Sequence, residues 1–222
     1  MSGKVSMVIP CYNKVGYVDD MFQSVYNQEW DNIEIIIVND GSTDGTREKM
    51  DAWESRFKER GYDVIIIDQE NLGVGTAVRN GLLKITGDYI CVPDCDDILS
   101  PYYVSHMAEV LENNFSVQWV WCNISKESMI HKIRNRSKLL LLLLLEYNNW
   151  SVCFKLVRTS YIEKCRVLDT FIESRITQEP QINIPLAAGG AWPHFLCEYL
   201  YSYNTTVESS IRNSSQKSEK QV

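Results

Sequence analysis

The chain has 222 residues, of which 45% are hydrophobic and 23% charged, and its formal net charge is −7. This length fits one domain, and the apolar content suffices for a core without disulfide support. Nucleic acid is excluded as an expected partner, because phosphate binding relies on clustered Lys and Arg and the sequence has no long basic run.

The cysteines and histidines do not form a metal-binding pattern. The seven cysteines include no CxxC pair, and the three histidines are scattered along the chain. We therefore expect reduced, mostly buried thiols and no zinc site. We expect no signal peptide before the first strand-like segment, and the apolar run Leu139–Leu145 is shorter than the about 20 residues that cross a bilayer. A soluble, cytoplasmic protein is the resulting expectation.

The first half of the chain alternates buried strands with amphipathic helices. The predicted strands are Val5–Ile9, Ile33–Val38, Tyr62–Ile67 and Tyr89–Val92. Apolar stripes predict helices around Val15, Val18, Phe22 and Val25, around Met50, Trp53 and Phe57, around Val74, Val78, Leu82 and Ile85, and around Val104, Met107 and Leu111. Such alternation predicts an α/β fold with a mostly parallel central sheet flanked by helices.

Later elements are less regular. Ser100–Pro101 is expected to open the helix that contains Val104, with Ser as the cap and Pro in the first turn. Beyond it the sequence predicts strands at Phe115–Cys122 and Val152–Val157, a short helix at Arg158–Cys165 and a helix start at Glu179–Pro180. Residues 123–150 have no clear period, and residues 207–222 form a polar tail that we expect to be mobile.

The chemistry is expected where the strands end, because ligands of open parallel sheets bind at the carboxyl ends of the strands. Asp94, Asp96 and Asp97 follow the fourth predicted strand and repel one another at neutral pH. Hard carboxylate oxygens suit magnesium or manganese, which bind substrate phosphates as well. The structural alternative is a solvated turn whose aspartates cap the next helix.

Glycine-rich phosphate loops are missing from the expected places. No Gly-x-x-x-x-Gly-Lys-Ser/Thr segment occurs, and Gly73–Gly75 follows the third strand, where it matches the dinucleotide fingerprint poorly. A metal held by the aspartates is then the remaining means of binding a diphosphate, which points to nucleotide-sugar chemistry.

Four segments, in this order, resemble family 2 glycosyltransferases. They are Val5–Asn13, Ile36–Thr46, Asn71–Ile90 and the Asp-x-Asp segment Asp94–Asp97. The match is weaker at Phe154–Ser160. Where the family usually has Glu-Asp at the opening of a helix, this chain has Gln178-Glu179-Pro180.

The resemblance implies a GT-A fold, with a Rossmann-like nucleotide half at about 1–100 and an acceptor half at about 101–206. It implies transfer from a nucleotide-diphosphate sugar, commonly a UDP-sugar, with inversion at the anomeric carbon and a manganese or magnesium cofactor. The acceptor would be a saccharide, a lipid-linked molecule or a protein-linked one. Lipid-linked acceptors would also place the protein at the inner face of a membrane, as a peripheral protein.

The same resemblance assigns the donor site. Pro10 and Tyr12 would lie at the base and ribose, Asp40 would accept a hydrogen bond from the base, and Arg79 would support the donor pocket. Asp94 would face the ribose or the metal. The plain structural alternatives are that Asp40 caps a helix, Tyr12 packs against its neighbours and Arg79 pairs with a surface acid.

Two further assignments concern the reaction itself. Asp96, with Asp94, would hold the cation that neutralises the departing nucleoside diphosphate. Glu179 would take the proton of the acceptor hydroxyl, although an acid is also favoured at a helix start by the macrodipole. The rival functions are a non-catalytic nucleotide-sugar binding module and a sugar-phosphate nucleotidyltransferase, whose usual glycine-rich loop is missing after the first strand.

Overall fold

The computed structural model describes residues 2–123, 151–172 and 179–204. The strands are β1 (Val5–Cys11), β2 (Ile33–Asp40), β3 (Asp63–Gln69), β4 (Tyr89–Cys91), β5 (Ile98–Leu99), β6 (Trp119–Asn123), β7 (Lys155–Arg158), β8 (His194–Tyr199) and β9 (Tyr201–Ser202). The helices are α1 (Val18–Tyr26), α2 (Thr46–Arg60), α3 (Val74–Leu82), α4 (Tyr103–Asn113), α6 (Thr159–Lys164), α7 (Val167–Thr170) and α8 (Glu179–Ala188). The run Leu139–Leu145, Gln178 and the predicted tail 207–222 lie outside the described residues.

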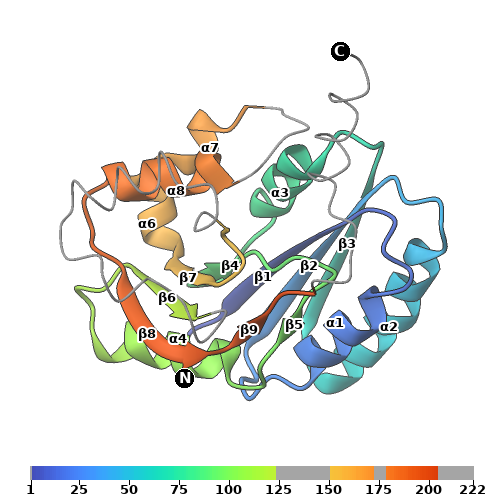
Figure 1. Cartoon of the computed structure of the whole chain (residues 1–222), viewed down its shortest axis with the longest axis horizontal. Helices are drawn as coiled ribbons and strands as arrows, with labels where there is room; N and C mark the ends of the chain where they lie inside the picture. Colours follow the sequence, from blue (N-terminus) through green and yellow to red (C-terminus); the bar gives the residue numbers. More distant parts are fainter. Residues whose placement is uncertain (1, 124–150, 173–178, 205–222) are drawn as a thin grey trace, which may run out of the picture.

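A seven-stranded sheet in the order β3-β2-β1-β4-β7-β6-β8 forms the centre of the molecule (Figure 1). Its strands β3, β2, β1 and β4 are parallel, as the alternation of strands and helices predicts. β7 runs antiparallel to both of its neighbours, β4 and β6, so the sheet is mixed on that side. β5 and β9 pair in a separate two-stranded sheet.

β1 and β2 are buried along their whole length, because helices cover both faces of the sheet. This burial explains why their sequences are continuous apolar runs and not an alternating pattern. β1 continues through Pro10 to Cys11, two residues past the predicted end. Its pairing with β4 stops at Met7, so β1 has a neighbour on only one side where Pro10 lacks an N–H.

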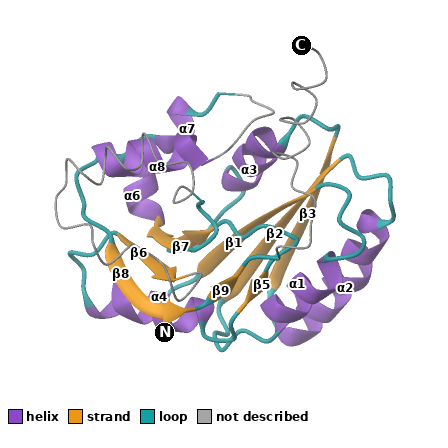
Figure 2. Cartoon of the chain, viewed as in Figure 1, coloured by secondary structure: helices purple, strands orange, loops and turns teal. Residues whose placement is uncertain are grey.

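The helices form two layers, with α3, α6, α7 and α8 on one side of the sheet and α1, α2 and α4 on the other (Figure 2). α1 and α2 pack through aromatic rings, with the ring centroid of Phe22 6.0 Å from Trp53 and 5.6 Å from Phe57. The predicted apolar stripe of α4 is confirmed, since Val104, Met107 and Leu111 are fully buried. No helix in the described part of the chain has the length and apolarity that crossing a membrane requires.

The helix predicted to open at Ser100–Pro101 begins instead at Tyr103. Ser100 is held by neighbours outside that helix: its N–H donates to the carbonyl of Leu200 at 2.9 Å, and its carbonyl accepts from Gln28 Nε2 at 2.7 Å. These bonds hold Ser100 at the end of β5 and delay the helix. Tertiary hydrogen bonds therefore overrode a local capping signal.

Two predicted strands also begin later than expected. Phe115 is 83% exposed and belongs to a turn in which Ser116 Oγ donates to Asn114 Oδ1 at 2.7 Å, so β6 starts at Trp119. Val152 likewise belongs to a turn, closed by a 3.2 Å bond from the N–H of Lys155, the first residue of β7. Both errors arise because apolar or β-prone residues occupy turns.

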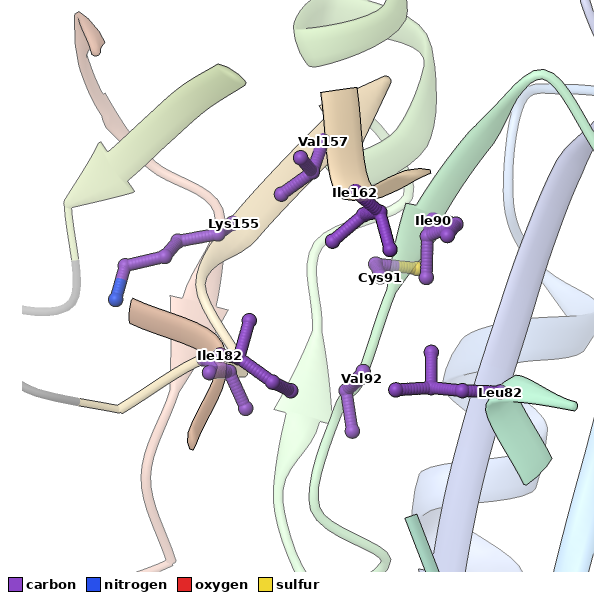
Figure 3. Close-up of a pocket in the computed structure, with 9 residues that line it drawn as sticks. Leu82, Ile90, Cys91, Val92, Lys155, Val157, Ile162 and Ile182 are labelled. Atoms are coloured by element: carbon purple, nitrogen blue, oxygen red, sulfur yellow. The ribbon is translucent and has the colours of Figure 1, made fainter. Parts of the chain in front are cut away.

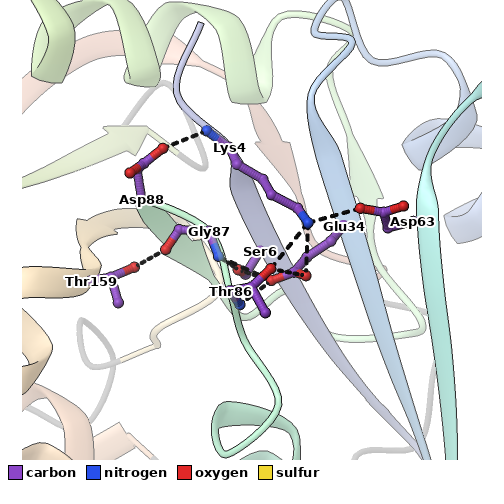
Figure 4. Close-up of polar contacts among 8 residues, drawn as sticks. All are labelled: Lys4, Ser6, Glu34, Asp63, Thr86, Gly87, Asp88 and Thr159. Atoms are coloured by element: carbon purple, nitrogen blue, oxygen red, sulfur yellow. Dashed lines mark hydrogen bonds and ion pairs between the residues drawn. The ribbon is translucent and has the colours of Figure 1, made fainter.

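A polar network fastens the amino-terminal ends of the central strands (Figure 4). Glu34 on β2 is 3% exposed and accepts hydrogen bonds from Ser6 Oγ, from the N–H and Oγ1 of Thr86 and from the N–H of Gly87. Lys4 Nζ lies 3.3 Å from Glu34 Oε2. Burial raises the pKa of Glu34, but these hydrogen bonds and the charge of Lys4 outweigh it, so the pKa is lowered overall.

The cysteine prediction is confirmed for the described residues. Cys11, Cys91, Cys95, Cys122 and Cys153 are buried, Cys165 is partly buried, Cys197 is exposed, and all seven are free thiols.

Candidate active site

The loops that follow β1, β2 and β4 meet at one end of the sheet. β1 lies between β2 and β4, so the strand order reverses direction there. In open α/β sheets such a switch leaves a crevice at the carboxyl ends of the strands, where ligands bind. Tyr12 follows β1, Asp40 ends β2 and Asp94 lies just beyond β4. The fold therefore brings these three predicted donor-binding residues to the same end of the sheet.

The loops after β1 and β2 are tied together by the segment that carries the family resemblance. The side chain of Asn13 accepts from the N–H of Thr43 at 2.8 Å, and its own N–H donates to Ser42 Oγ at 3.1 Å. Asp44 Oδ2 accepts from the N–H of Val15 at 3.0 Å. These bonds fix both loops and hold Asn13 in the left-handed region, at φ 49°.

Asp40 is buried and fixes the loop that follows β3. Its Oδ1 accepts from Gln69 Nε2 and from the N–H of Leu72, both at 2.8 Å, and its Oδ2 accepts from the N–H of Gly73 at 2.9 Å. This loop-holding contact was not predicted from the sequence. Each carboxylate oxygen can accept more than one hydrogen bond, so base recognition by Asp40 stays a prediction.

Pro10, Tyr12 and Arg79 differ in their exposure to solvent and in the elements that carry them. Pro10 is buried within β1, whereas the side chain of Tyr12 is 44% exposed in the loop beyond it. Arg79 lies in the last turn of α3 and is partly buried. Within the described ranges no acid pairs with its guanidinium, contrary to the surface ion pair that was the structural alternative.

The acidic turn Asp94–Asp97 is held by residues from the other end of the chain. Tyr201 donates its hydroxyl proton to Asp97 Oδ2 at 2.7 Å and accepts from the N–H of Asp94 at 3.1 Å. The N–H of Asn204 donates to Asp97 Oδ1 at 2.8 Å. Tyr201 was missed by sequence reasoning, because β9 is a two-residue strand with no periodic signal.

Negative charge accumulates around Asp94. Burial raises its pKa well above the ordinary value, and the charges of Asp97, Glu179 and Asp96 add to the rise. Burial also raises the pKa of Asp97, to about 6. Ligand atoms of Asp94, Asp97 and Cys153 all lie within 4.8 Å of one another. A cation would relieve this repulsion, and no described residue donates a hydrogen bond to the Asp94 carboxylate, so the site fits a metal.

Asp96, the predicted main metal ligand, lies outside that three-residue group. Its Oδ2 accepts from Lys14 Nζ at 2.6 Å, which leaves Oδ1 without a hydrogen bond from the described residues. Cys153 was not foreseen as a neighbour of the acidic turn, because it comes from the turn before β7, far along the chain.

Glu179 begins α8, as predicted. Its negative charge is among the causes that raise the pKa of Asp94, so the two carboxylates interact electrostatically. Oε2 of Glu179 is buried and has no hydrogen-bond partner within the described ranges. Burial raises the pKa of Glu179, and the charge of Lys155 opposes that rise. A carboxyl group in such surroundings has the proton affinity that a general base needs.

Lys155 is a second functional candidate that sequence reasoning missed. It is 1% exposed, and its Nζ donates to the carbonyl of Ser151 and to Asn183 Oδ1, both at 2.8 Å. The ammonium lies 4.3 Å from the centroid of the Trp121 ring. Burial lowers its pKa to about 7.

A small apolar cavity lies between α3, β4, β7 and α8 (Figure 3). Its volume is about 20 Å³, which is space for one water-sized molecule and not for a nucleotide. It is lined by Leu82, Ile90, Cys91, Val92, Val152, Lys155, Val157, Ile162 and Ile182. Lys155 directs its Nζ away from the other labelled side chains, and the remaining lining residues are apolar residues of the core.

Known proteins resemble this chain in sequence and in fold. Glycosyltransferase GlyA of Streptococcus pneumoniae serotype 4 is 36% identical over 101 residues, which are 46% of this chain and 14% of GlyA. The putative glycosyltransferase EpsH of Bacillus subtilis is 35% identical over 126 residues, 55% of this chain and 34% of EpsH. The chain thus aligns with no more than about a third of either relative.

Two solved structures share the fold at low sequence identity. Staphylococcus aureus TarS 1-349 in complex with UDP-GlcNAc has a TM-score of 0.72 at 15% identity, over 95% of this chain and 61% of that one. Mannosyltransferase PcManGT from Pyrobaculum calidifontis, in complex with GDP-Man and Mn²⁺, has a TM-score of 0.74 at 15% identity, over 100% and 66%. The expected GT-A fold is therefore confirmed.

The family assignment comes from a longer match. Residues 6–166 match the family described as "Glycosyl transferase family 2"; they are more than half of the chain and overlap all four resembling segments. The chain belongs to glycosyl transferase family 2.

Proposed function

We propose that this chain transfers a sugar from a nucleotide-diphosphate sugar, with UDP as the first candidate, to an acceptor hydroxyl. The supporting observation is the accumulation of carboxylates around Asp94, including Glu179, at the switch in strand order. The UDP-GlcNAc and GDP-Man complexes of the structural relatives support a donor of this class. Residues at about 1–100 would bind the nucleotide, and those at about 101–206 the acceptor.

The leaving group must be stabilised as the sugar departs. Asp94 and Asp96 would hold a manganese or magnesium ion, which when bound supplies positive charge against the developing negative charge of the nucleoside diphosphate. Asp97 has a different task in this proposal. Its two oxygens accept from Tyr201 and Asn204, so it keeps the turn in shape.

The acceptor must be activated on the opposite side. Glu179 would take the proton of the acceptor hydroxyl as the new bond forms, in its ionised state. The buried position of Glu179 raises its pKa and so makes the carboxylate a stronger base than an exposed one. A single displacement by that hydroxyl would invert the anomeric centre.

The donor nucleotide would lie over the first two loops. Pro10 and Tyr12 would contact the base and ribose, and Asp40 would accept a hydrogen bond from the base while it holds the loop after β3. Arg79 would support the donor pocket from the last turn of α3.

A donor screen tests this function. UDP- and GDP-sugars are incubated with the protein, with manganese and without it, and the release of UDP or GDP is measured. Release of UDP or GDP that requires manganese, either with an acceptor present or by hydrolysis of the donor, supports an enzymatic function. Donor binding by calorimetry without any release, across all donors and simple saccharide acceptors, would favour the non-catalytic binding module instead.

A further inference from the structure

The ion pair between Lys14 and Asp96 places a fixed positive charge beside the acidic turn. Nζ of Lys14 lies 2.6 Å from Asp96 Oδ2, and the two side chains are only 22% and 20% exposed. The backbone of Lys14 is held in place, because its N–H donates to Thr46 Oγ1 at 2.8 Å. The loops after β1 and β2 therefore aim this ammonium at the loop after β4.

The charge of Lys14 acts on the whole turn and not on Asp96 alone. Burial raises the pKa values of Asp94 and Asp97, and the ammonium of Lys14 opposes that rise at both residues. In turn, burial lowers the pKa of Lys14, and the hydrogen bond and charge of Asp96 outweigh that effect. The lysine thus partly neutralises the carboxylates in the manner expected of a bound cation.

We propose that Lys14 substitutes for the metal ion in the empty enzyme and moves to a donor phosphate when metal and donor bind together. This inference rests on the proposed function, since it needs a metal and a diphosphate at the acidic turn. It adds a phosphate-binding residue and a reason for metal and donor to bind as a pair.

The argument is electrostatic. A divalent ion beside Asp96 repels the ammonium, so metal binding alone must separate or strain the 2.6 Å pair. A diphosphate brings negative charge that gives the ammonium a new partner, and the flexible stem of a lysine allows the small movement. Each ligand should therefore bind weakly alone and more tightly in the presence of the other.

A lysine that only stabilises the fold would behave differently. Its removal would loosen the loop and weaken both metal and nucleotide. The proposal instead requires opposite effects: removal of the competing charge strengthens the binding of metal alone, while removal of the phosphate partner weakens the binding of nucleotide in the presence of metal.

Calorimetry with three titrations tests this: manganese alone, UDP or GDP alone, and each nucleotide in saturating manganese. The variants are Lys14→Met and Lys14→Arg, with Lys58→Met as the matched control, since Lys58 pairs with Glu54 on the surface of α2. For Lys14→Met we expect manganese alone to bind about threefold to tenfold more tightly and the nucleotide with manganese about tenfold more weakly. Lys14→Arg should keep part of the coupling, and the control should match the parent protein.

Two failures are distinguishable. If the parent protein binds manganese and nucleotide synergistically but Lys14→Met leaves manganese affinity unchanged or weakens it, the role of Lys14 is wrong and the proposed function stands. If the parent protein binds neither nucleotide in the presence of manganese, both proposals are overturned.

Discussion

Glu179 and Lys155 share one side of the candidate site, and burial acts on both of them in opposite directions. It raises the pKa of the carboxyl group and lowers that of the ammonium to about 7. Their opposite charges stabilise each other, so Lys155 keeps the pKa of Glu179 lower than burial alone would. Asn183, which accepts from Lys155 Nζ, lies one helical turn beyond Glu179 on α8 and fixes the lysine to the same helix.

Glu179→Gln should separate donor binding from transfer. The amide keeps the shape of the side chain but cannot accept the proton, so we expect kcat to fall by about 10²- to 10⁴-fold with little change in donor affinity. In the parent enzyme the rate should decline on the acid side at a pH above the ordinary glutamate value of 4.5, because the base must be ionised and its pKa is raised.

The measurements for this variant are steady-state kinetics across pH and donor titration by calorimetry. Glu59→Gln on the exposed surface of α2 is the control and should leave both unchanged. Full activity in Glu179→Gln would remove Glu179 from the mechanism.

Asp96→Ala should abolish the dependence of donor binding on metal. Loss of a carboxylate ligand is expected to weaken nucleotide binding in manganese by at least about 100-fold, while the weak metal-free binding remains. Asp31→Ala is the matched control, because Asp31 precedes β2 at the opposite end of the sheet and its side chain is 89% exposed. If donor binding by Asp96→Ala were still stimulated by manganese, the metal ligands would have to be Asp94 and Asp97 instead.

At the scale of elements, the position of α3 against the sheet depends on one small residue. A Cβ on Gly81 would lie 2.4 Å from Cγ1 of Val8 on β1 and 3.2 Å from Cγ2 of Val38 on β2. The glycine therefore permits the close approach of α3 to β1 and β2.

Gly81→Ala should destabilise the fold by about 1–3 kcal/mol, because the methyl group forces α3 away from two buried valines. The free energy of unfolding is measured by urea titration. Gly16→Ala is the control, since a Cβ there would meet nothing within 4 Å, and its effect should stay within about 0.5 kcal/mol. Equal stability of the two variants would show that the helix adjusts without cost.

The central elements were predictable because their burial leaves a simple pattern. β1, β2 and β4 appear as short apolar runs, and α2 and α3 as apolar stripes, since each packs one defined face in the core. β5 and β9 are two-residue strands that carry no period. The late starts of α4 and β6 depend on tertiary hydrogen bonds and on a turn that local propensity does not record.

At the scale of the whole molecule, the buried Glu34 network links stability to pH. The pKa of Glu34 is lowered from 4.5 in the folded state, so its contribution to stability is present above that value and is lost as the pH falls below it. Acid should therefore loosen the amino-terminal ends of β1 and β2, where Glu34 joins Ser6 and Thr86.

Glu34→Gln should be less stable than the parent protein by about 1–3 kcal/mol at pH 7. The difference should narrow as the pH falls below 4.5, because the parent loses the advantage of its carboxylate as Glu34 takes up a proton. Urea midpoints at several pH values, from about 7 to well below 4.5, measure this. A constant difference across that range would contradict the ionic origin of the stabilisation.

The candidate site was only partly predictable at this scale. Asp40, Asp94 and Glu179 could be named from the sequence because each follows a recognisable strand or opens a helix. Cys153 and Tyr201 reach the same acidic turn from segments more than 50 residues away. Such convergence depends on the sheet order, which places the antiparallel β7 directly beside β4.

The hydroxyl of Tyr201 has a consequence for how the protein matures on the ribosome. It bonds to Asp97, which lies 104 residues earlier in the chain. Translation delivers Asp94–Asp97 before Tyr201, at about 5–20 residues per second, so a nascent chain exposes its clustered aspartates before the strand that fastens them has been synthesised. Chains that end before Tyr201 therefore lack the hydrogen bonds that hold the acidic turn in shape.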